Sequence, residues 1–342
     1  MVAGWLLSER VRLTRIAAID CGTNTIRLLI ADCAMSTSER ADSADGGTPI
    51  LHDVLRRMGF VRLGAGIDAT GCIGAAAMQR TLDAVRDYGA ECAEHDVERV
   101  RFVATSASRD ASNADEFIHG VEAAFAAYGI SPEVVTGAAE AALSFRGATA
   151  GLVSADVAQP YLVVDLGGGS TEFVRGLHTV AAARSVDIGA VRLTERHLLA
   201  DPPTTAQLAA AVADIDAAIE IADAEVDFSG IATLVGLAGT VTTVTAHALH
   251  LPLYDRSAIH GAVVPVVDVL ESCASLVGAD RSVRAALPFM HEGRIDVIAA
   301  GAVIWSRVVT RVAARSGIQD VRTSEADILD GIALSLADDT RA

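Results

Sequence analysis

The amino-acid sequence predicts an α/β protein in which one unit, three strands followed by alternating helices and strands (βββαβαβα), occurs twice. Three observations favour this fold class. Short apolar runs typical of strands alternate with longer stretches of helical pattern. The order of these runs in the first half of the chain is repeated in the second half. A turn of matching composition follows the first strand of each half.

The first half is predicted to open with strands near 15–20, 25–32 and 50–63, which are rich in apolar residues. The elements expected after them are a helix near 74–95, a strand over 99–105, a helix from about 111 to 128, a short strand over 132–135 and an alanine-rich helix over 137–148.

The second half is predicted to follow the same order. Its expected elements are strands near 160–165, 171–176 and 179–187, helical material to about 223, a strand over 232–238, a helix from about 240, further helices within 266–316, a strand over 318–323 and a closing helix from about 325. The polar segments 36–49 and 151–160 are expected to be surface loops. We predict an N-terminal extension over 1–14, a first domain over 15–134 and a second over 135–342, with the C-terminal helix docking back on the first domain.

The composition excludes several classes of protein. No apolar run reaches the ~18 residues needed to cross a bilayer, and the opening residues lack the pattern of a signal peptide. Five cysteines without a CxxC spacing indicate neither a disulfide framework nor a zinc cluster, which favours a reducing cytoplasm. A formal net charge of −17 argues against a broad nucleic-acid-binding face.

All 27 basic residues are arginine, and the chain contains no lysine. A compositional bias explains this absence, but it has a chemical consequence. It removes the lysine of a P-loop and every mechanism that uses a Schiff base. Any phosphate must therefore be bound by backbone amides, arginines and a metal ion.

The two matching turns share the spacing D-x-G-x-x-[ST], as DCGTNT over 20–25 and DLGGGS over 165–170. One copy could be an ordinary hairpin turn, but two copies at equivalent places indicate a function. Glycines let backbone amides surround an anion, and the hydroxyl adds a donor. The residues expected to contact phosphate are Gly22, Thr23, Asn24, Thr25, Gly167, Gly168, Gly169 and Ser170.

At these residues the chain resembles the actin-like phosphotransferase superfamily, and within it the exopolyphosphatase and guanosine pentaphosphate phosphohydrolase (Ppx/GppA) family. The resemblance covers nearly the whole chain from about residue 15, in its short two-domain form. It rests, in family order, on AIDCGTNTIRLLIAD, FVATSASRDASN, VVTGAAEAALSFRGA, VVDLGGGSTEFV, DIGAVRLTE, GLAGTVTT and GRIDVIAAGA. It implies duplicated actin-like (ribonuclease H-like) domains around a central cleft, and Mg²⁺-dependent release of a terminal phosphate.

The resemblance implies that Glu140 is the catalytic base that deprotonates the attacking water. The residues alone favour another interpretation, in which Gly137 caps a helix and Glu140 stabilises its first turn by ~0.3–1 kcal/mol. Many relatives carry two adjacent acidic residues here, whereas this chain has Ala139 before Glu140. The terminal segment SEADILDG also departs from relatives, which often carry an arginine and a glutamate before its last glycine.

Three further carboxylates are expected to hold Mg²⁺, directly or through water: Asp20, Asp165 and Glu172. Glu172 could instead be a solvent-facing strand residue. Phosphate contacts are also expected from Arg109, Arg192, Gly239 and Thr240, although loop arginines are usually only solvated and a Gly-Thr turn can simply cap a helix. Arg56, Arg57 and Arg62 are candidates for a positive channel.

The preferred function is an exopolyphosphatase that hydrolyses inorganic polyphosphate. The alternatives are a guanosine pentaphosphate (pppGpp) phosphohydrolase, a sensor that binds such anions without hydrolysing them, and, least favoured, a kinase for a small acceptor. The expected partners are these phosphate compounds and, from the resemblance, a second copy of the chain, but neither nucleic acid nor membrane.

Overall fold

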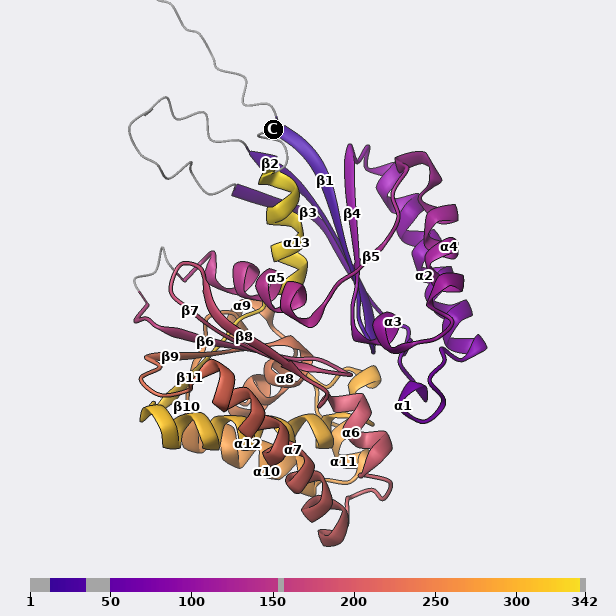
Figure 1. The fold of residues 1–342 in the computed structure, drawn as a ribbon. Helices are drawn as coiled ribbons and strands as arrows, with labels where there is room; N and C mark the ends of the chain where they lie inside the picture. Colours follow the sequence, from indigo (N-terminus) through magenta and orange to yellow (C-terminus); the bar gives the residue numbers. More distant parts are fainter. Residues whose placement is uncertain (1–12, 35–49, 153–156, 339–342) are drawn as a thin grey trace, which may run out of the picture.

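The computed structural model describes residues 13–34, 50–152 and 157–338, which form two β-sheets with helices on their faces (Figure 1). The first sheet has the order β3-β2-β1-β4-β5. Its strands are β1 (Leu13–Cys21), β2 (Thr25–Ala34), β3 (Ile50–Phe60), β4 (Arg99–Ala104) and β5 (Glu133–Val134). β1, β2 and β3 form an antiparallel meander, whereas β4 and β5 run parallel to β1.

The centre of the first sheet is buried on both faces, which explains why its central strand β1 is mostly apolar. Ala17 and Ile19 of β1 face a core shared with α2 (Ala75–Glu94) and α4 (Ala114–Ala124). Ile16 and Ala18 point the other way, into a core shared with α13 (Ile328–Asp338). The shorter elements of this half are α1 (Ile67–Thr70), α3 (Ser106–Asp110) and the 3-10 helix η1 (Ala126–Tyr128).

The second sheet has the order β8-β7-β6-β9-β11-β10, which repeats the first and adds one edge strand. Its strands are β6 (Tyr161–Leu166), β7 (Thr171–Gly176), β8 (Val180–Val186), β9 (Thr233–Leu237), β10 (Val263–Pro265) and β11 (Asp320–Thr323). The helices of this half are α6 (Ala190–Arg196), α7 (Thr205–Val226), α8 (Ala238–Ala248), α9 (Arg256–Ile259), α10 (Val266–Gly278), α11 (Arg281–Ala285), the 3-10 helix η3 (Glu292–Arg294) and α12 (Ile298–Ser316). The largest core lies between this sheet and helices that include α7, α8, α10 and α12.

Helices α5 (Gly137–Thr149) and α13 lie between the two sheets and cross each other closely (Figure 1). α5 packs on β6, β7 and β8, and α13 packs on β1, β2 and β4. Glycines make the crossing possible, because a Cβ at Gly147 would collide with the backbone at Asp327, and a Cβ at Gly331 would collide with the backbone of Leu143. The two helices thus join the two sheets.

The predicted fold class and the repeated order of elements are confirmed, with local differences. The helix expected over 111–128 is shorter, because α4 begins at Ala114 and ends at Ala124 with η1 after it, and the short helix α3 before it was not predicted. The three-residue edge strand β10 was not predicted. The proposed extension (apart from residues 13 and 14, in β1), the polar segment 36–49 and the middle of 151–160 lie outside the described residues. The proposed domain boundaries remain predictions.

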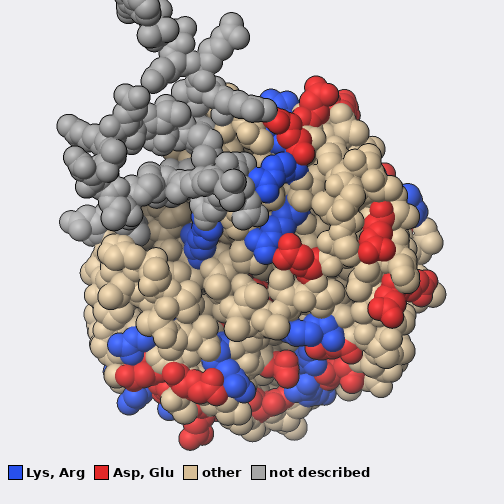
Figure 2. Space-filling view, turned by 45° about the horizontal axis from the view of Figure 1, so that its top comes forward, with Lys and Arg blue, Asp and Glu red and all other residues tan. Residues whose placement is uncertain are grey.

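Within the part of the chain that the structure describes, no helix is both long enough and apolar enough to cross a membrane. On the face shown in Figure 2, the described arginines lie among acidic side chains rather than in one broad basic area.

Candidate active site

The two glycine-rich turns adopt the same geometry and meet at one cleft. In the first hairpin the amide of Gly22 donates to the carbonyl of Thr25 (2.9 Å), and in the second the amide of Gly167 donates to the carbonyl of Ser170 (3.0 Å). The loops approach so closely that a Cβ at Gly169 would lie 2.7 Å from the Oγ1 of Thr23. Between them lies a cavity of about 130 Å³.

Most of the predicted site residues line this cleft. They are Asp20, Gly22, Thr23, Asn24, Thr25, Glu140, Asp165, Gly167, Gly168, Ser170, Glu172, Gly239 and Thr240. Three predicted residues, Arg109, Gly169 and Arg192, do not line it. Thr105 and Ser106, at the start of α3, add hydroxyl groups that were not predicted, and Ser106 Oγ lies 2.8 Å from Thr23 Oγ1.

The carboxylates of the second hairpin are buried and close to one another. Asp165 and Glu172 are directly opposite residues of β6 and β7, and Glu172 is only 1% exposed, so it is not a solvent-facing strand residue. Ser144 Oγ donates to Asp165 (2.6 Å), and Ser185 Oγ donates to Glu172 (2.7 Å). Burial, and then the neighbouring carboxylate of Asp327, raises the pKa of Asp165 to about 6.

Burial followed by repulsion from Asp165 raises the pKa of Glu172 to about 8. Two buried carboxyl groups with raised pKa values, side by side on neighbouring strands, indicate a site that is completed by a positive charge. The hydroxyl donors of Ser144 and Ser185 keep the two carboxyl groups aimed at the cleft.

Glu140 enters the cleft from the first turn of α5. Thr136, not Gly137, caps this helix: its hydroxyl accepts from the amide of Ala139 (3.3 Å), which places Glu140 at the fourth helical position. Glu140 is 8% exposed, and Arg109 Nη1 donates to its Oε2 at 3.3 Å. The pKa of Glu140 is well above its usual value because of burial and then the Glu172 and Asp165 carboxylates, while Arg109 opposes the shift.

Arg109 and Arg192 hold parts of the site rather than facing its cavity. Arg109 also donates to the carbonyl of Val135, immediately before the cap of α5. Arg192, whose side chain is 14% exposed, donates to the carbonyl of Gly169 (2.8 Å). It also forms ion pairs with Asp68 and Asp110 (2.6 Å each), which belong to the first half of the chain. Arg192 therefore fixes the second loop against helices α1 and α3 of the first half.

Arg27 is a site residue that the sequence interpretation missed. It stands opposite Asp20 in the first hairpin, where Glu172 stands opposite Asp165 in the second. Its guanidinium donates to Oδ2 of Asp20 (2.6 and 3.0 Å) and forms an ion pair with Asp327. The equivalent position thus carries a fixed cation in one hairpin and a carboxyl group in the other.

The start of α8 forms another wall of the cleft. Ala238 has φ +68°, a left-handed conformation that residues with a Cβ rarely adopt. The first turn of α8 begins at the cavity. Its amide groups, including those of Gly239 and Thr240, favour an anion there. Arg294, also missed in the sequence interpretation, packs against Gly239, donates to Thr243 (3.0 Å) and lines the cleft.

The donor set suits Mg²⁺ held with the help of a phosphate ligand. Among the described residues, no three His, Cys, Asp or Glu side chains are grouped to hold a metal by themselves. Mg²⁺ commonly takes only one or two protein carboxylates and completes its shell with water and phosphate oxygens. The Asn24 side-chain oxygen is buried without a hydrogen-bond partner in the described chain, which leaves a polar atom at the cleft for such a ligand.

Two sheets of the same order, each with a phosphate-type hairpin at a shared cleft, define a protein of the actin-like class. The chain belongs to the Ppx/GppA phosphatase family, whose sequence profile matches residues 41–337.

Among individual relatives, "Exopolyphosphatase 2" of Mycobacterium tuberculosis is 50% identical over 327 residues, which cover 95% of this chain and 99% of that protein. A guanosine-5'-triphosphate,3'-diphosphate pyrophosphatase of Aeromonas salmonicida is 30% identical over 226 residues, 66% of this chain and 42% of that protein. The crystal structure of an exopolyphosphatase-like protein superimposes with a TM-score of 0.87 at 40% identity and covers 96% of this chain and 100% of its own. For an exopolyphosphatase from Cytophaga hutchinsonii the TM-score is 0.80 at 26% identity, covering 95% of this chain and 98% of that one.

Proposed function

We propose that this protein is an exopolyphosphatase, which hydrolyses the terminal phosphoanhydride bond of inorganic polyphosphate and releases orthophosphate. The observation that carries this proposal is the cleft itself, where two amide-rich loops face four buried carboxyl groups, Asp20, Glu140, Asp165 and Glu172. The similarity to exopolyphosphatase 2 over nearly the full length of both chains supports this substrate class.

In this proposal Glu140 orients the attacking water and takes its proton. A carboxylate is a weak base at its ordinary pKa, and the raised pKa of Glu140 makes it a stronger one. Arg109 holds the carboxyl group from the side and limits the rise of its pKa, so that the base can still lose its proton. The amides and hydroxyls of the two loops and of α8 bind the phosphate oxygens, and negative charge that develops there is stabilised by donors already in place.

We assign Mg²⁺ to the side of the cleft formed by Asp165 and Glu172, with Asp20 as a further, outer contact because Arg27 occupies one of its oxygens. When bound there, Mg²⁺ would neutralise phosphate charge and polarise the terminal phosphate. Location in the cytoplasm and formation of a dimer remain predictions.

Hydrolysis of guanosine pentaphosphate is the second candidate, and the Aeromonas salmonicida relative supports it. That match covers 42% of the relative, whereas exopolyphosphatase 2 is matched almost end to end, which is why polyphosphate is the preferred substrate. A sensor without hydrolytic activity would not need a buried carboxyl group at position 140, so the presence of Glu140 favours an enzyme.

The test is orthophosphate release with Mg²⁺ from polyphosphates of several lengths and from guanosine pentaphosphate, with wild type and Glu140→Gln side by side. We expect wild type to prefer polyphosphate and the variant to lose at least ~100-fold in kcat while its affinity for polyphosphate is kept. Preference for guanosine pentaphosphate would select the second candidate. Binding without phosphate release by wild type would select the sensor.

A further inference from the structure

The second glycine-rich loop is held from behind by residues 189–196, which are α6 with its N-cap and which we call the second backing segment. Backbone amides at the start of α6 donate to the carbonyls of Gly167 (3.0 Å) and Gly168 (2.9 Å). The carbonyl of Gly169 accepts from Nε of Arg192 (2.8 Å). All three glycine carbonyls of the loop therefore face α6.

This arrangement leaves the amides of the second loop for an anion. In a planar trans peptide unit the C=O and N–H groups point in opposite directions, so the amides of Gly168, Gly169 and Ser170 point away from α6. The part of the chain that the structure describes offers none of these three amides a hydrogen-bond acceptor. Successive amides on one side of a turn form a nest that binds anions. The contacts from the second backing segment thus set the shape in which the loop can bind phosphate.

The first loop is held in the same way by residues 61–68, which follow β3 and which we call the first backing segment. The carbonyl of Asn24 accepts from two amides of this segment (2.9 and 3.1 Å), and the carbonyl of Thr23 accepts from the amide of Gly64 (2.9 Å). The approach is close, because a Cβ at Gly64 would lie 2.2 Å from Cγ2 of Thr23. Each loop thus has its own backing segment, which follows the third strand of its sheet.

The two backing segments are joined to each other across the halves of the chain. Arg192 forms ion pairs with Asp68 of the first backing segment and with Asp110 of α3 (2.6 Å each). The carboxylate of Glu195 accepts from the amide of Gly66 (3.1 and 3.2 Å). The Arg192 side chain is 14% exposed, so solvent weakens its ion pairs less than it weakens pairs at the surface. The guanidinium that holds the second loop is thus itself held by the first half.

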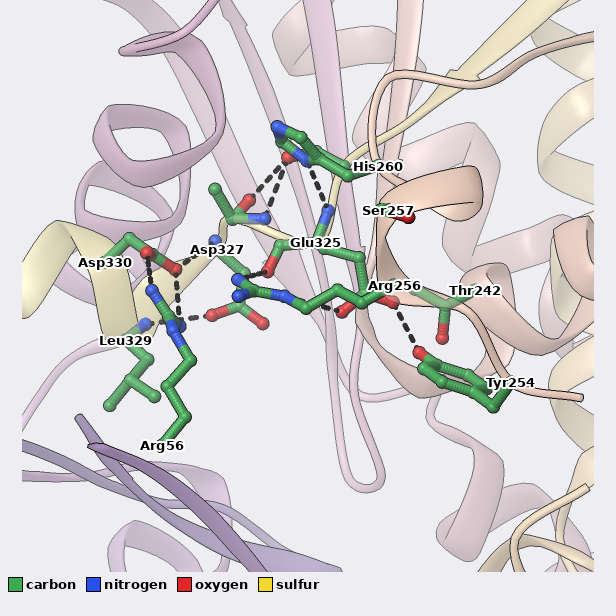
Figure 3. Close-up of polar contacts among 12 residues, drawn as sticks. Arg56, Thr242, Tyr254, Arg256, Ser257, His260, Glu325, Asp327, Leu329 and Asp330 are labelled. Carbon is green, nitrogen blue, oxygen red and sulfur yellow. Dashed lines mark hydrogen bonds and ion pairs between the residues drawn. The ribbon is translucent and has the colours of Figure 1, made fainter. Parts of the chain in front are cut away.

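This junction lies apart from the passage of the chain between its halves. Residues 324–327 lead from β11 back to α13. Around this passage, Arg56 from the first sheet pairs with Asp330, and Arg256 from the second half pairs with Glu325 (Figure 3). In Figure 1, α1 and α6 lie beside each other and away from α13. The backing segments therefore join the two halves at a separate place.

We propose that Arg192 is a positioning residue for substrate binding, which holds the Gly169 peptide so that the second loop keeps its anion-binding shape. Its anchors are Asp68 and Asp110, so this shape depends on the first half of the chain. Neither acid lines the active-site cleft. The inference rests on the proposed function only for its ligand, a compound that ends in linked phosphates, and it concerns binding and not the hydrolytic step.

The two acids make the direction of the effect decisive. The ligand is a polyanion, and removal of a negative charge near its site should strengthen its binding if only long-range electrostatics acts. If the acids act through Arg192, their removal should weaken binding, because the guanidinium loses an anchor. Asp68→Asn and Asp110→Asn therefore separate positioning from general electrostatics.

The test measures equilibrium binding by calorimetry with Mg²⁺, using the full chain carrying Glu140→Gln so that the ligand is not consumed. The probes are tripolyphosphate and guanosine pentaphosphate. The variants added to this parent are Asp68→Asn, Asp110→Asn, Arg192→Gln and the combination of Arg192→Gln with Asp110→Asn.

We expect each aspartate variant to bind both probes roughly three- to tenfold more weakly, and Arg192→Gln to bind them ~10-fold more weakly or worse. Adding Asp110→Asn to Arg192→Gln should cause no further loss, because the acid then has nothing to anchor. The matched control is Asp214→Asn, which removes partners of Arg196 and His197 within the second half. Its affinity should stay within about twofold of the parent.

Variants that keep Glu140 supply a second readout. Asp110→Asn should raise the KM for polyphosphate and leave kcat within about threefold, because it weakens binding and does not alter the base or the carboxyl groups of the cleft. Damage to folding would instead reduce the fraction of active enzyme, which lowers kcat and leaves KM unchanged. A thermal melt of each variant identifies any that fails to fold.

Unchanged or tighter binding in both aspartate variants would overturn the proposal, and so would an additive loss in the combined variant or an equal loss in Asp214→Asn. If wild type released no phosphate from either probe, the proposed function would fail, but the measured affinities would still decide whether Arg192 positions the loop. The two failures are therefore distinguishable.

Discussion

Replacing Glu172 by glutamine should stabilise the protein in the absence of divalent metal ions. The carboxyl group is 1% exposed, and its pKa is raised from 4.5 to about 8 by burial and by Asp165. Below pH ~4.5 both the folded and the unfolded chain hold this proton, so folding carries no penalty. Above that pH the unfolded chain releases it more readily, and the free energy of unfolding falls until the folded carboxyl group also ionises near pH 8.

The magnitude follows from the two pKa values. At pH 7 the loss amounts to roughly 3 kcal/mol, because each pH unit between them costs up to 1.36 kcal/mol. Glu172→Gln removes this penalty, and its amide can still contact Ser185. The variant should therefore be the more stable protein at pH 7 and should lose less stability between pH 5 and pH 8 than wild type.

The assay is urea denaturation of both proteins in EDTA at several pH values across this range. Glu94→Gln, which changes an exposed glutamate on α2, is the matched control and should behave like wild type. If wild type and Glu172→Gln lose stability in parallel between pH 5 and pH 8, the reasoning from buried charge is wrong.

Three further outcomes are expected. Arg27→Gln leaves two buried carboxylates without their cation and should lower the free energy of unfolding by roughly 3–5 kcal/mol, as measured by urea denaturation; a loss below ~1 kcal/mol would show that the pairs are not needed. Arg109→Gln removes the charge that lowers the pKa of Glu140, so the acidic limb of the pH–rate profile should move to higher pH, and an unmoved limb would contradict this role. Gly169→Ala places a methyl group 2.7 Å from Thr23 Oγ1, which should separate the two loops and lower phosphate release by ~10-fold or more, whereas wild-type rates would show that the loops need not touch.

The sequence could predict those residues of the site that lie in short, repeated motifs. The two hairpins, their equivalent positions and the carboxyl groups of Asp20, Asp165 and Glu172 all lie within short segments, because β1–β2 and β6–β7 are sequential antiparallel pairs. The same comparison of the two hairpins could have predicted Arg27 as a site residue, since it occupies the position in the first hairpin that Glu172 occupies in the second.

Other features depend on contacts between distant segments, which a single sequence does not reveal. Arg192 was assigned to phosphate, but it is paired with Asp68 and Asp110, more than eighty residues earlier. The pairing of Arg56 with Asp330 depends on how α13 returns to the first sheet. The start of α4 at Ala114, later than expected, has a similar cause, because the side chain of Asn113 before it bonds to the backbone of Ile73.

The difference between the hairpins at Arg27 and Glu172 gives the cleft an inherent direction. Gene duplication would be expected to produce two interchangeable halves, and a symmetrical ligand such as linear polyphosphate could then enter either way round. The first hairpin carries the fixed cation of Arg27, whereas the second carries the carboxyl group of Glu172, which leaves a place for an exchangeable cation. This difference breaks that symmetry. Under the proposed function, this asymmetry would distinguish the last phosphate of a chain from the next one and so favour removal of phosphate from the end over cleavage in the middle.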